Sequence, residues 1–323
     1  TEPMKKILDY IFLMRPMLIV PVWTISLLGA RAALWRERGI SPVTIDRFPF
    51  VDFTSSDISL LVMLALSTLL AGGVFIINQI YDVESDRLNK KLFLIPEGHV
   101  SISEAWGLYI ATTAIALIGA FVLSWQLGCL FVAGAWFGFQ YSYPLFKLRE
   151  HPYKQCRNNI VAHGTLAFLF GWVMYLNFDI EGIIRSLPYL LAVAAVYLNT
   201  TLPDVAGDQA TGKRTYGIEW GVVRTQKVAF TLVLSGALFS VMIADYAFTV
   251  TALISLPFFL VAWLKESEPL SALASKVAII VLSIFAALFF PLYAAILAVT
   301  IIATRIYYAR RFNLNYPVLT EKH

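Results

Sequence analysis

Apolar stretches long enough to cross a bilayer as a helix, about 20 residues each, recur along almost the whole chain and are separated by short polar breaks. Of the 323 residues, 59% are hydrophobic and 14% are charged. This composition is far from that of soluble domains, and it leaves no room for a sizeable soluble domain. The chain is therefore expected to fold with lipid as its main solvent, where helices satisfy their own backbone hydrogen bonds.

The apolar pattern predicts an all-α, polytopic membrane protein with about nine transmembrane helices in a bundle. The predicted helices span residues 8–33, 58–82, 104–124, 127–145, 160–177, 184–203, 226–244, 247–264 and 277–307. The last window carries Pro291 near its middle, so either one kinked helix or two shorter helices are expected there. Arg15 and Pro16 interrupt the first window, which is expected to be a retained helix rather than a secretory signal.

Charge placement predicts an orientation. With helix parity, the breaks near residues 83–103, 146–159 and 204–225 share the side of the amino terminus, and this side carries more Lys and Arg. The break at residues 34–57 is assigned to the opposite side, as is the end of the last helix with Arg305, Arg310 and Arg311. The excess of positive charge predicts that the amino terminus and the active-site loops are cytoplasmic.

Several classes of site are disfavoured by the composition. The net charge of +4 is small and dispersed, so nucleic acid is not expected as a partner. Cys129 and Cys156 are isolated, which indicates neither a zinc site nor a disulfide framework. His99 and His163 lack the spacing of metal ligands and are expected to be hydrogen-bonded structural histidines.

Acidic residues stand where two of the predicted helices end. Asn78, Asp82 and Asp86 follow one another at intervals of four, so on a helix they stack on one face with a drift of about 40° per step. Asp204 and Asp208 repeat this interval after the sixth helix. A single DxxxD is most often a solvated face or a cap, but two copies at matching places favour a functional site.

The repeated acidic motif predicts how the chain is organised. Each copy follows a long apolar helix and precedes a stretch that is basic or contains glycine. We therefore expect one transmembrane domain over residues 1–323 with two related halves, about 1–145 and 146–323, of four helices each plus one.

The acidic residues predict a metal site. Carboxylates at the membrane end of apolar helices are costly to desolvate, and two clusters facing each other would gather several negative charges. Divalent cations would relieve this repulsion. Hard oxygen ligands suit Mg²⁺, which bridges a few carboxylates to substrate phosphates. The sequence therefore predicts two Mg²⁺ ions, held by Asn78, Asp82, Asp86, Asp204 and Asp208, that bind a diphosphate.

Basic side chains near the same breaks are predicted to neutralise that diphosphate. Arg15 stands out because it lies in an apolar helix, and the alternative for it is a snorkelling arginine near the interface. Ordinary topology-determining charge and interfacial aromatic residues are the alternatives for the others. The predicted diphosphate-binding set is Arg15, Lys147, Arg149, Lys154, Lys213, Arg214 and Tyr141. The break from Arg87 to Ser101 is expected to act as a lid that excludes water.

These motifs resemble those of the UbiA superfamily of intramembrane prenyltransferases. In that family NxxxDxxxD follows the second helix and DxxxD follows the sixth, and Asn78, Asp82 and Asp86 match the first motif while Asp204 to Asp208 match the second. The resemblance implies a Mg²⁺-dependent enzyme that transfers a prenyl group from an isoprenoid diphosphate to an aromatic or other lipophilic acceptor. The diphosphate would ionise to give an allylic carbocation.

The sequence leaves the acceptor open, since Phe93 stands where many family members have an arginine. Candidate acceptors include an aromatic acid or quinone precursor, a glycerol phosphate lipid, a porphyrin derivative and another isoprenoid. Two other classes of protein also fit parts of the pattern. An ion-coupled transporter would have intramembrane carboxylates and repeated halves, and a noncatalytic lipid-binding protein would share the fold.

Overall fold

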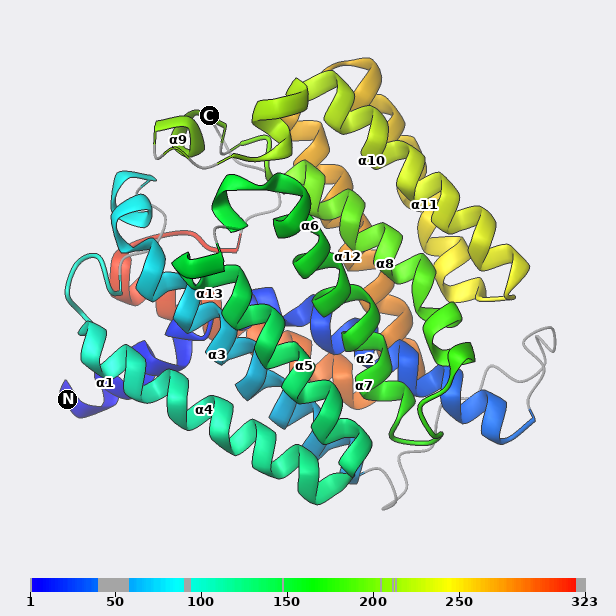
Figure 1. Cartoon of the computed structure of the whole chain (residues 1–323), viewed down its shortest axis with the longest axis horizontal. Coiled ribbons are helices and arrows are strands. Elements are labelled where there is room, and N and C mark those ends of the chain that lie inside the picture. The colour runs from blue at the N-terminus through cyan, green and yellow to red at the C-terminus, as the bar shows by residue number, and fades with distance from the viewer. Residues whose placement is uncertain are drawn as a thin grey trace.

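The computed structural model describes residues 2–39, 58–89, 94–146, 148–203, 205–210, 212 and 214–317. All regular structure in these residues is helical (Figure 1). Eight of the described helices are long and apolar enough to cross a membrane. The predicted fold class, an all-α polytopic membrane protein, is confirmed.

The helices lie in the following order along the chain. They are α1 (Glu2–Leu13), α2 (Pro16–Glu37), α3 (Ile58–Asn89), α4 (Ile102–Leu123), α5 (Trp125–Ser142), the 3-10 helices η2 (Pro144–Phe146) and η3 (Leu148–Glu150), α6 (Pro152–Ile160), the π-helix η4 (Val161–Leu166), α7 (Ala167–Trp172), α8 (Ile180–Thr200), α9 (Val205–Ala210), α10 (Tyr216–Met242), α11 (Tyr246–Leu264), α12 (Glu268–Phe289) and α13 (Pro291–Phe312).

Two of the nine predicted windows are split, and a proline begins the second helix in each case. The first window breaks at Arg15, and α2 starts at Pro16. The last window breaks at Phe290, and α13 starts at Pro291. Proline has no backbone N–H to donate to the preceding turn but fits the first turn of a new helix. The last window therefore contains two helices, which is one of the two outcomes expected from the sequence.

The break before α13 changes where the carboxyl-terminal charges lie. Because α13 runs back along the bundle, its last turn meets α1, and the guanidinium Nε of Arg311 is 3.2 Å from Oδ1 of Asp9. Arg310 and Arg311 therefore lie at the same end of the bundle as the amino terminus (Figure 1). The prediction that assigned them to the opposite side is wrong, because it treated residues 277–307 as one crossing.

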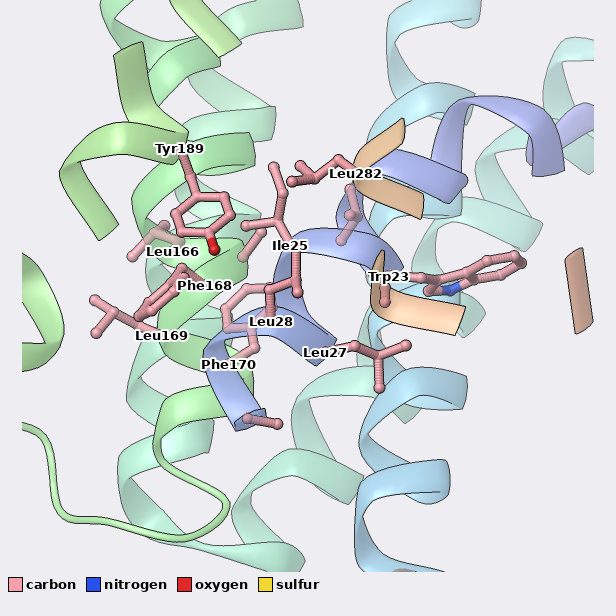
Figure 2. Close-up of a cluster of buried hydrophobic side chains, with 14 of the residues drawn as sticks. Trp23, Ile25, Leu27, Leu28, Leu166, Phe168, Leu169, Phe170, Tyr189 and Leu282 are labelled. Atoms are coloured by element: carbon pink, nitrogen blue, oxygen red, sulfur yellow. The ribbon is translucent and has the colours of Figure 1, made fainter. Parts of the chain in front are cut away.

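Helix α2 lies at the centre of the largest hydrophobic core, among α3, α7 and α12 (Figure 2). The backbones of α2 and α7 touch at two glycines. A Cβ atom on Gly171 would lie 1.7 Å from the carbonyl oxygen of Ser26, and one on Gly29 would lie 2.0 Å from that of Phe168. Small residues that let backbones approach are a common basis of helix packing in membranes. This contact fixes α7, and the segment before it, against α2.

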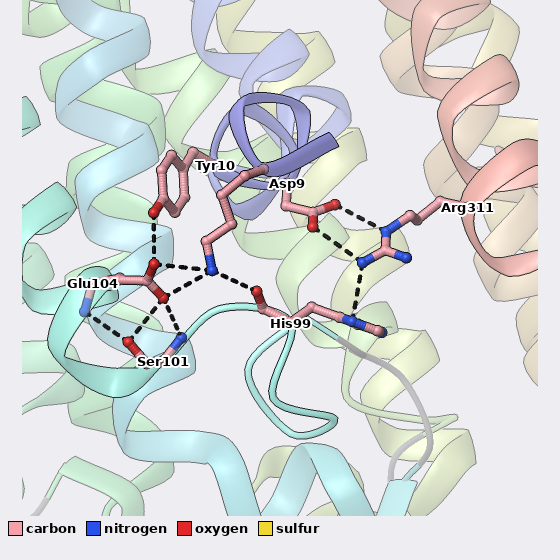
Figure 3. A network of polar contacts seen from close by, with 7 residues as sticks. Asp9, Tyr10, His99, Ser101, Glu104 and Arg311 are labelled. Carbon is pink, nitrogen blue, oxygen red and sulfur yellow. Dashed lines mark hydrogen bonds and ion pairs between the residues drawn. The ribbon is translucent and has the colours of Figure 1, made fainter. Parts of the chain in front are cut away.

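A second hydrophobic cluster joins the end of α3, α1, residues 94–100 and α13. A polar network covers it (Figure 3). Lys6 donates to the carbonyl oxygen of His99 at 2.9 Å and to Glu104, which also accepts from Tyr10. The hydrogen bond to Glu104 raises the pKa of Lys6. Ser101 and Glu104 form a capping box that starts α4.

These contacts anchor most of the described part of the predicted lid. His99 lies 3.0 Å from Arg311 through Nδ1, and Val100 is fully buried. The sequence predicts a lid from residue 87 to 101, but residues 94–101 are held between α1 and α13. His99 is a hydrogen-bonded structural histidine, as expected from the sequence.

Candidate functional site

The first acidic motif occupies the last turns of α3. Asn78, Asp82 and Asp86 lie on consecutive turns and are partly buried. The amide Nδ2 of Asn78 donates to Oδ2 of Asp82 at 3.1 Å. This contact brings the first two members of the motif together on one face of the helix, as residues four apart on a helix do.

The second acidic motif lies next to the first. Asp208 is in α9, which packs against α3 (Figure 1). The carboxylate-bearing side chain of Asp208 is buried, with 4% of its surface exposed. Asp204 lies outside the described residues. The fold therefore brings together two acidic segments that are far apart in the sequence.

The candidate metal ligands on α3 and α9 are all oxygen atoms. Across residues 2–39, 58–89 and the other described ranges, no three Asp, Glu, His or Cys side chains form a metal-binding group by themselves. The candidate ligands are the amide oxygen of Asn78 and the carboxylates of Asp82 and Asp86 on α3, and the carboxylate of Asp208 on α9, which packs against α3. Mg²⁺ uses few protein oxygens, keeps several waters and completes its shell with substrate phosphates. The chemistry of this donor set fits Mg²⁺.

A cavity of about 170 Å³ opens beside the acidic end of α3, among α2, α3, α5 and the α6–η4–α7 segment. Its polar lining consists of Arg15, Asn78, Tyr141, Asn158, Asn159 and His163, together with Ser67, whose hydroxyl donates to the carbonyl oxygen of Leu64 in the same helix. Its apolar lining includes Val22, Leu70, Val74, Phe75, Phe137 and Phe170. We call this space the candidate cavity.

The candidate cavity changes from polar to apolar with depth. On α3, Leu70 lies eight residues from Asn78, which is about 12 Å along a helix. On α5, Gly134 lies deeper than Tyr141 in the same way. Polar groups therefore gather at the acidic end, and apart from Ser67, whose hydroxyl donates within its own helix, hydrocarbon surface lines the interior. This arrangement is suited to an amphiphile with an anionic head and an apolar tail.

Arg15 lies at the polar end of the cavity. It is the residue before α2, with φ 56° and ψ 62°, so it adopts a left-handed conformation rather than lying inside a helix as the sequence predicted. This conformation is uncommon and costly for a residue with a side chain. The guanidinium lies 6.0 Å from the ring centroid of Phe75. Burial raises the pKa of Tyr316, and the nearby Arg15 cation opposes this.

The other predicted diphosphate-binding residues differ in position. Tyr141 lines the candidate cavity together with Arg15. Lys154 is partly buried on α6 but does not line the cavity. Arg214 is paired with Glu219, at 2.6 Å between Nη2 and Oε1. Lys147, Lys213 and the side chain of Arg149 lie outside the described residues.

The polar residues that the α6–η4–α7 segment contributes to the cavity were not predicted from the sequence. Asn158 is buried, with 1% of its surface exposed, and lines the cavity with Asn159 and His163. Polar residues at helical spacing inside an otherwise apolar segment could have indicated this face. The sequence predicts that His163 is a hydrogen-bonded structural histidine, but its imidazole forms no hydrogen bond with any described residue. It stacks on Phe75 instead, with ring centroids 6.3 Å apart.

The model of the UbiA prenyltransferase family matches residues 50–277. This range includes both acidic motifs and every helix from α3 to α11. It covers well over half of the chain.

Curated relatives include glycinol 4-dimethylallyltransferase of Glycine max, which is 27% identical over 173 residues, covering 49% of this chain and 41% of that protein. Digeranylgeranylglyceryl phosphate synthase of Korarchaeum cryptofilum is 29% identical over 214 residues, covering 60% of this chain and 69% of that protein. The chain spans 40 to 44% of the length of the first three curated relatives that it matches.

Solved structures share the fold. A UbiA homolog from Archaeoglobus fulgidus bound to GPP and Mg²⁺ aligns over 88% of this chain and 99% of that chain, with a TM-score of 0.64 and 20% identity. The apo structure of a UbiA homolog from Aeropyrum pernix K1 aligns over 80% of this chain and 94% of that chain, with a TM-score of 0.61 and 21% identity.

Proposed function

Because this chain belongs to the UbiA prenyltransferase family, we propose that it transfers a prenyl group from an isoprenoid diphosphate to an aromatic or other lipophilic acceptor inside the membrane. The observation that carries this proposal is the candidate cavity. It has Arg15 and Asn78 at one end and hydrocarbon side chains in its interior. A prenyl diphosphate has the same division into an anionic head and an apolar tail.

The diphosphate head is proposed to bind between α3 and α9. Asn78, Asp82, Asp86, Asp204 and Asp208 would hold two Mg²⁺ ions there. When bound, Mg²⁺ supplies positive charge that stabilises the leaving diphosphate. The hydrogen bond from Asn78 to Asp82 fixes the orientation of both side chains before substrate arrives.

The remaining phosphate oxygens are assigned to cations of the chain. Arg15 forms no ion pair with a described carboxylate, so its planar guanidinium can bind two phosphate oxygens. Tyr141 can donate from its hydroxyl at the same end of the cavity. Lys147, Arg149, Lys154, Lys213 and Arg214 remain candidates for the same role.

The prenyl tail is proposed to lie in the apolar part of the cavity. Leu70, Phe137 and Phe170 line this part. They would exclude water while the allylic carbon to oxygen bond breaks, because water would capture the carbocation. This position puts the reacting carbon near the boundary between the polar and apolar lining.

The relatives suggest classes of substrate. Solved UbiA homologs are bound to GPP and DMAPP with Mg²⁺, and the curated relatives include a glycinol 4-dimethylallyltransferase and a digeranylgeranylglyceryl phosphate synthase. We propose a prenyl diphosphate as the donor and an aromatic or other lipophilic acceptor as the partner. The transporter alternative gains no support, since the acidic residues lie at the end of α3 and in α9, and the described helices α3 and α8 that precede them are unbroken.

The site is proposed to face the cytoplasm. The amino terminus, the end of α3, α9 and the end of α13 lie at one end of the bundle (Figure 1). Because Arg310 and Arg311 also lie at this end, it carries more positive charge than the sequence alone predicted. Positively charged loops are retained in the cytoplasm.

The function can be tested with purified protein in lipid nanodiscs. Radiolabelled dimethylallyl and geranyl diphosphate would be supplied with Mg²⁺ and either homogentisate or geranylgeranylglyceryl phosphate. We expect release of pyrophosphate and transfer of label to one acceptor. Absence of both with every pair would reject the proposal.

A further inference from the structure

His163 occupies an unusual place in the candidate cavity. It lies in η4, a π-helix, between the two α-helical parts of the same segment. π-Helical turns are rare and occur often at functional sites. A Cβ atom on the next residue, Gly164, would lie 2.6 Å from Cα of Leu190 in α8. The segment is therefore pressed against α8 on one face while His163 lines the cavity.

The imidazole has no hydrogen-bonding partner in the described part of the chain. Its contact is with Phe75, whose ring is nearly parallel to it at an interplanar angle of 10°. Polar groups removed from bulk water are normally hydrogen-bonded. A neutral imidazole has one nitrogen that donates and one that accepts, so His163 offers both to whatever fills the cavity.

His163 lies at the level where the chemistry is expected. Phe75 precedes Asn78 by three residues, about 4.5 Å along a helix, and it contacts both His163 and Arg15. The imidazole is thus next to the boundary between the polar and apolar linings. Under the proposed function, this is where the prenyl carbon bonded to the diphosphate would lie.

We propose that His163 is the base that takes the proton from the acceptor during prenyl transfer, an inference that rests on the proposed function. The bond between the prenyl carbon and the diphosphate oxygen breaks, and its electron pair leaves on the diphosphate. The acceptor atom forms the new bond to that carbon. The proton of the acceptor moves to the free nitrogen lone pair of His163 and later leaves with the diphosphate.

The other cavity side chains are less suited to this step. Asn158 and Asn159 have no basic nitrogen, and the guanidinium of Arg15 offers hydrogen-bond donors but no acceptor. Tyr141 would first have to lose its own proton. Among the described residues that line the cavity, His163 alone combines a basic lone pair with a position beside the apolar lining.

The test compares His163→Gln with the native protein, using geranyl diphosphate, Mg²⁺ and homogentisate or geranylgeranylglyceryl phosphate. Glutamine retains a hydrogen-bond donor and an acceptor but cannot take a proton. We expect transfer to the acceptor to fall about 100-fold, the lower range for general base catalysis. Pyrophosphate release without acceptor should fall by a smaller factor than transfer does, because that step needs no base. His151→Gln is the matched control, because His151 is exposed on the same segment and forms no capping hydrogen bond.

A second variant separates proton transfer from packing. His163→Ala leaves space for a small ring, and added imidazole should restore transfer while pyrrole, which has the same shape but no basic lone pair, should not. Equal rescue by both rings, or native transfer in His163→Gln, would overturn the inference and leave the proposed function intact. If the native protein prenylates neither acceptor, the proposed function fails and the inference fails with it.

Discussion

Arg311 near the end of α13 donates two hydrogen bonds to the buried carboxylate of Asp9 in α1, across 302 positions of the chain. The same guanidinium lies 3.0 Å from His99, in the segment that follows the first acidic motif. One side chain thus joins both ends of the described chain to a loop of the candidate site (Figure 3). This relationship leads to the first prediction.

Arg311→Ala should loosen residues 94–101. The substitution leaves Asp9 buried, with the hydroxyl of Tyr307 as its remaining hydrogen-bond donor. Hydrogen bonds to charged groups contribute about 1.5 to 3 kcal/mol each, so amide hydrogen exchange in this segment should accelerate by more than tenfold. Arg310→Ala, which changes an exposed neighbour, serves as the control. Unchanged exchange in Arg311→Ala would mean that the loop is held without this network.

Asp82→Ala and Asp204→Ala should each abolish Mg²⁺-dependent release of pyrophosphate. Loss of one group that stabilises the leaving charge costs at least about 100-fold in rate. Glu84→Ala is the matched control, because Glu84 lies two residues along α3 and its side chain is 76% exposed. Native rates in either Asp variant, or full activity of the native protein in excess chelator, would contradict the two-motif metal site.

Arg15→Lys should weaken binding of a prenyl diphosphate. If the guanidinium binds two phosphate oxygens, the change should cost about 1 to 3 kcal/mol. A snorkelling arginine would tolerate lysine almost without loss. Titration of a nonhydrolysable diphosphate analogue at fixed Mg²⁺ distinguishes the two outcomes. Arg224→Lys is the control, since Arg224 stacks on Trp220 and does not line the cavity.

Gly134→Val should shorten the prenyl tail that the cavity accepts. A Cβ atom on Gly134 would lie 3.2 Å from Leu70 and 3.5 Å from Phe170, in the apolar part of the cavity. The branched side chain would fill that space. Release of pyrophosphate from geranyl diphosphate should therefore fall relative to release from dimethylallyl diphosphate. Gly107→Val provides a control, because a Cβ atom there meets nothing within 4 Å. An unchanged ratio would place the tail elsewhere.

Gln209 and Arg310 should be accessible from the same side of the membrane, and Glu37 from the other. All three are exposed. After replacement of Cys129 and Cys156, single cysteines at these positions can be labelled with an impermeant thiol reagent in oriented vesicles. If Arg310→Cys and Glu37→Cys were labelled from the same side of the membrane, α13 could not run back to the end of the bundle that holds the amino terminus.

The single long helices were predictable because their apolar windows are unbroken, and so was the first acidic motif. The interval between Asn78 and Asp82 fixes their contact on any helix. That α9 packs against α3 depends on contacts between segments far apart in the sequence. No local pattern gives such contacts.

The breaks were harder to predict because proline at the first turn of a helix resembles proline within one. Pro16 and Pro291 each start a helix here, and the residues directly next to each break are mostly apolar. The role of the segment with Asn158 and His163 was missed for a different reason. Helical spacing puts its polar residues on one face, but only the packing of the helices shows that this face borders a cavity.

Because a π-helix lies between α6 and α7, deleting a residue from this segment should disturb the cavity more than substituting one. Removing one residue from Val161–Leu166 would restore an ordinary α-helix and rotate everything before it by about 100° relative to α7. Because Gly171 fixes α7 against α2, the rotation would fall on Asn158 and Asn159 and turn them out of the cavity. In related chains, substitutions within these six positions should therefore be common, while gaps in an alignment should be rare.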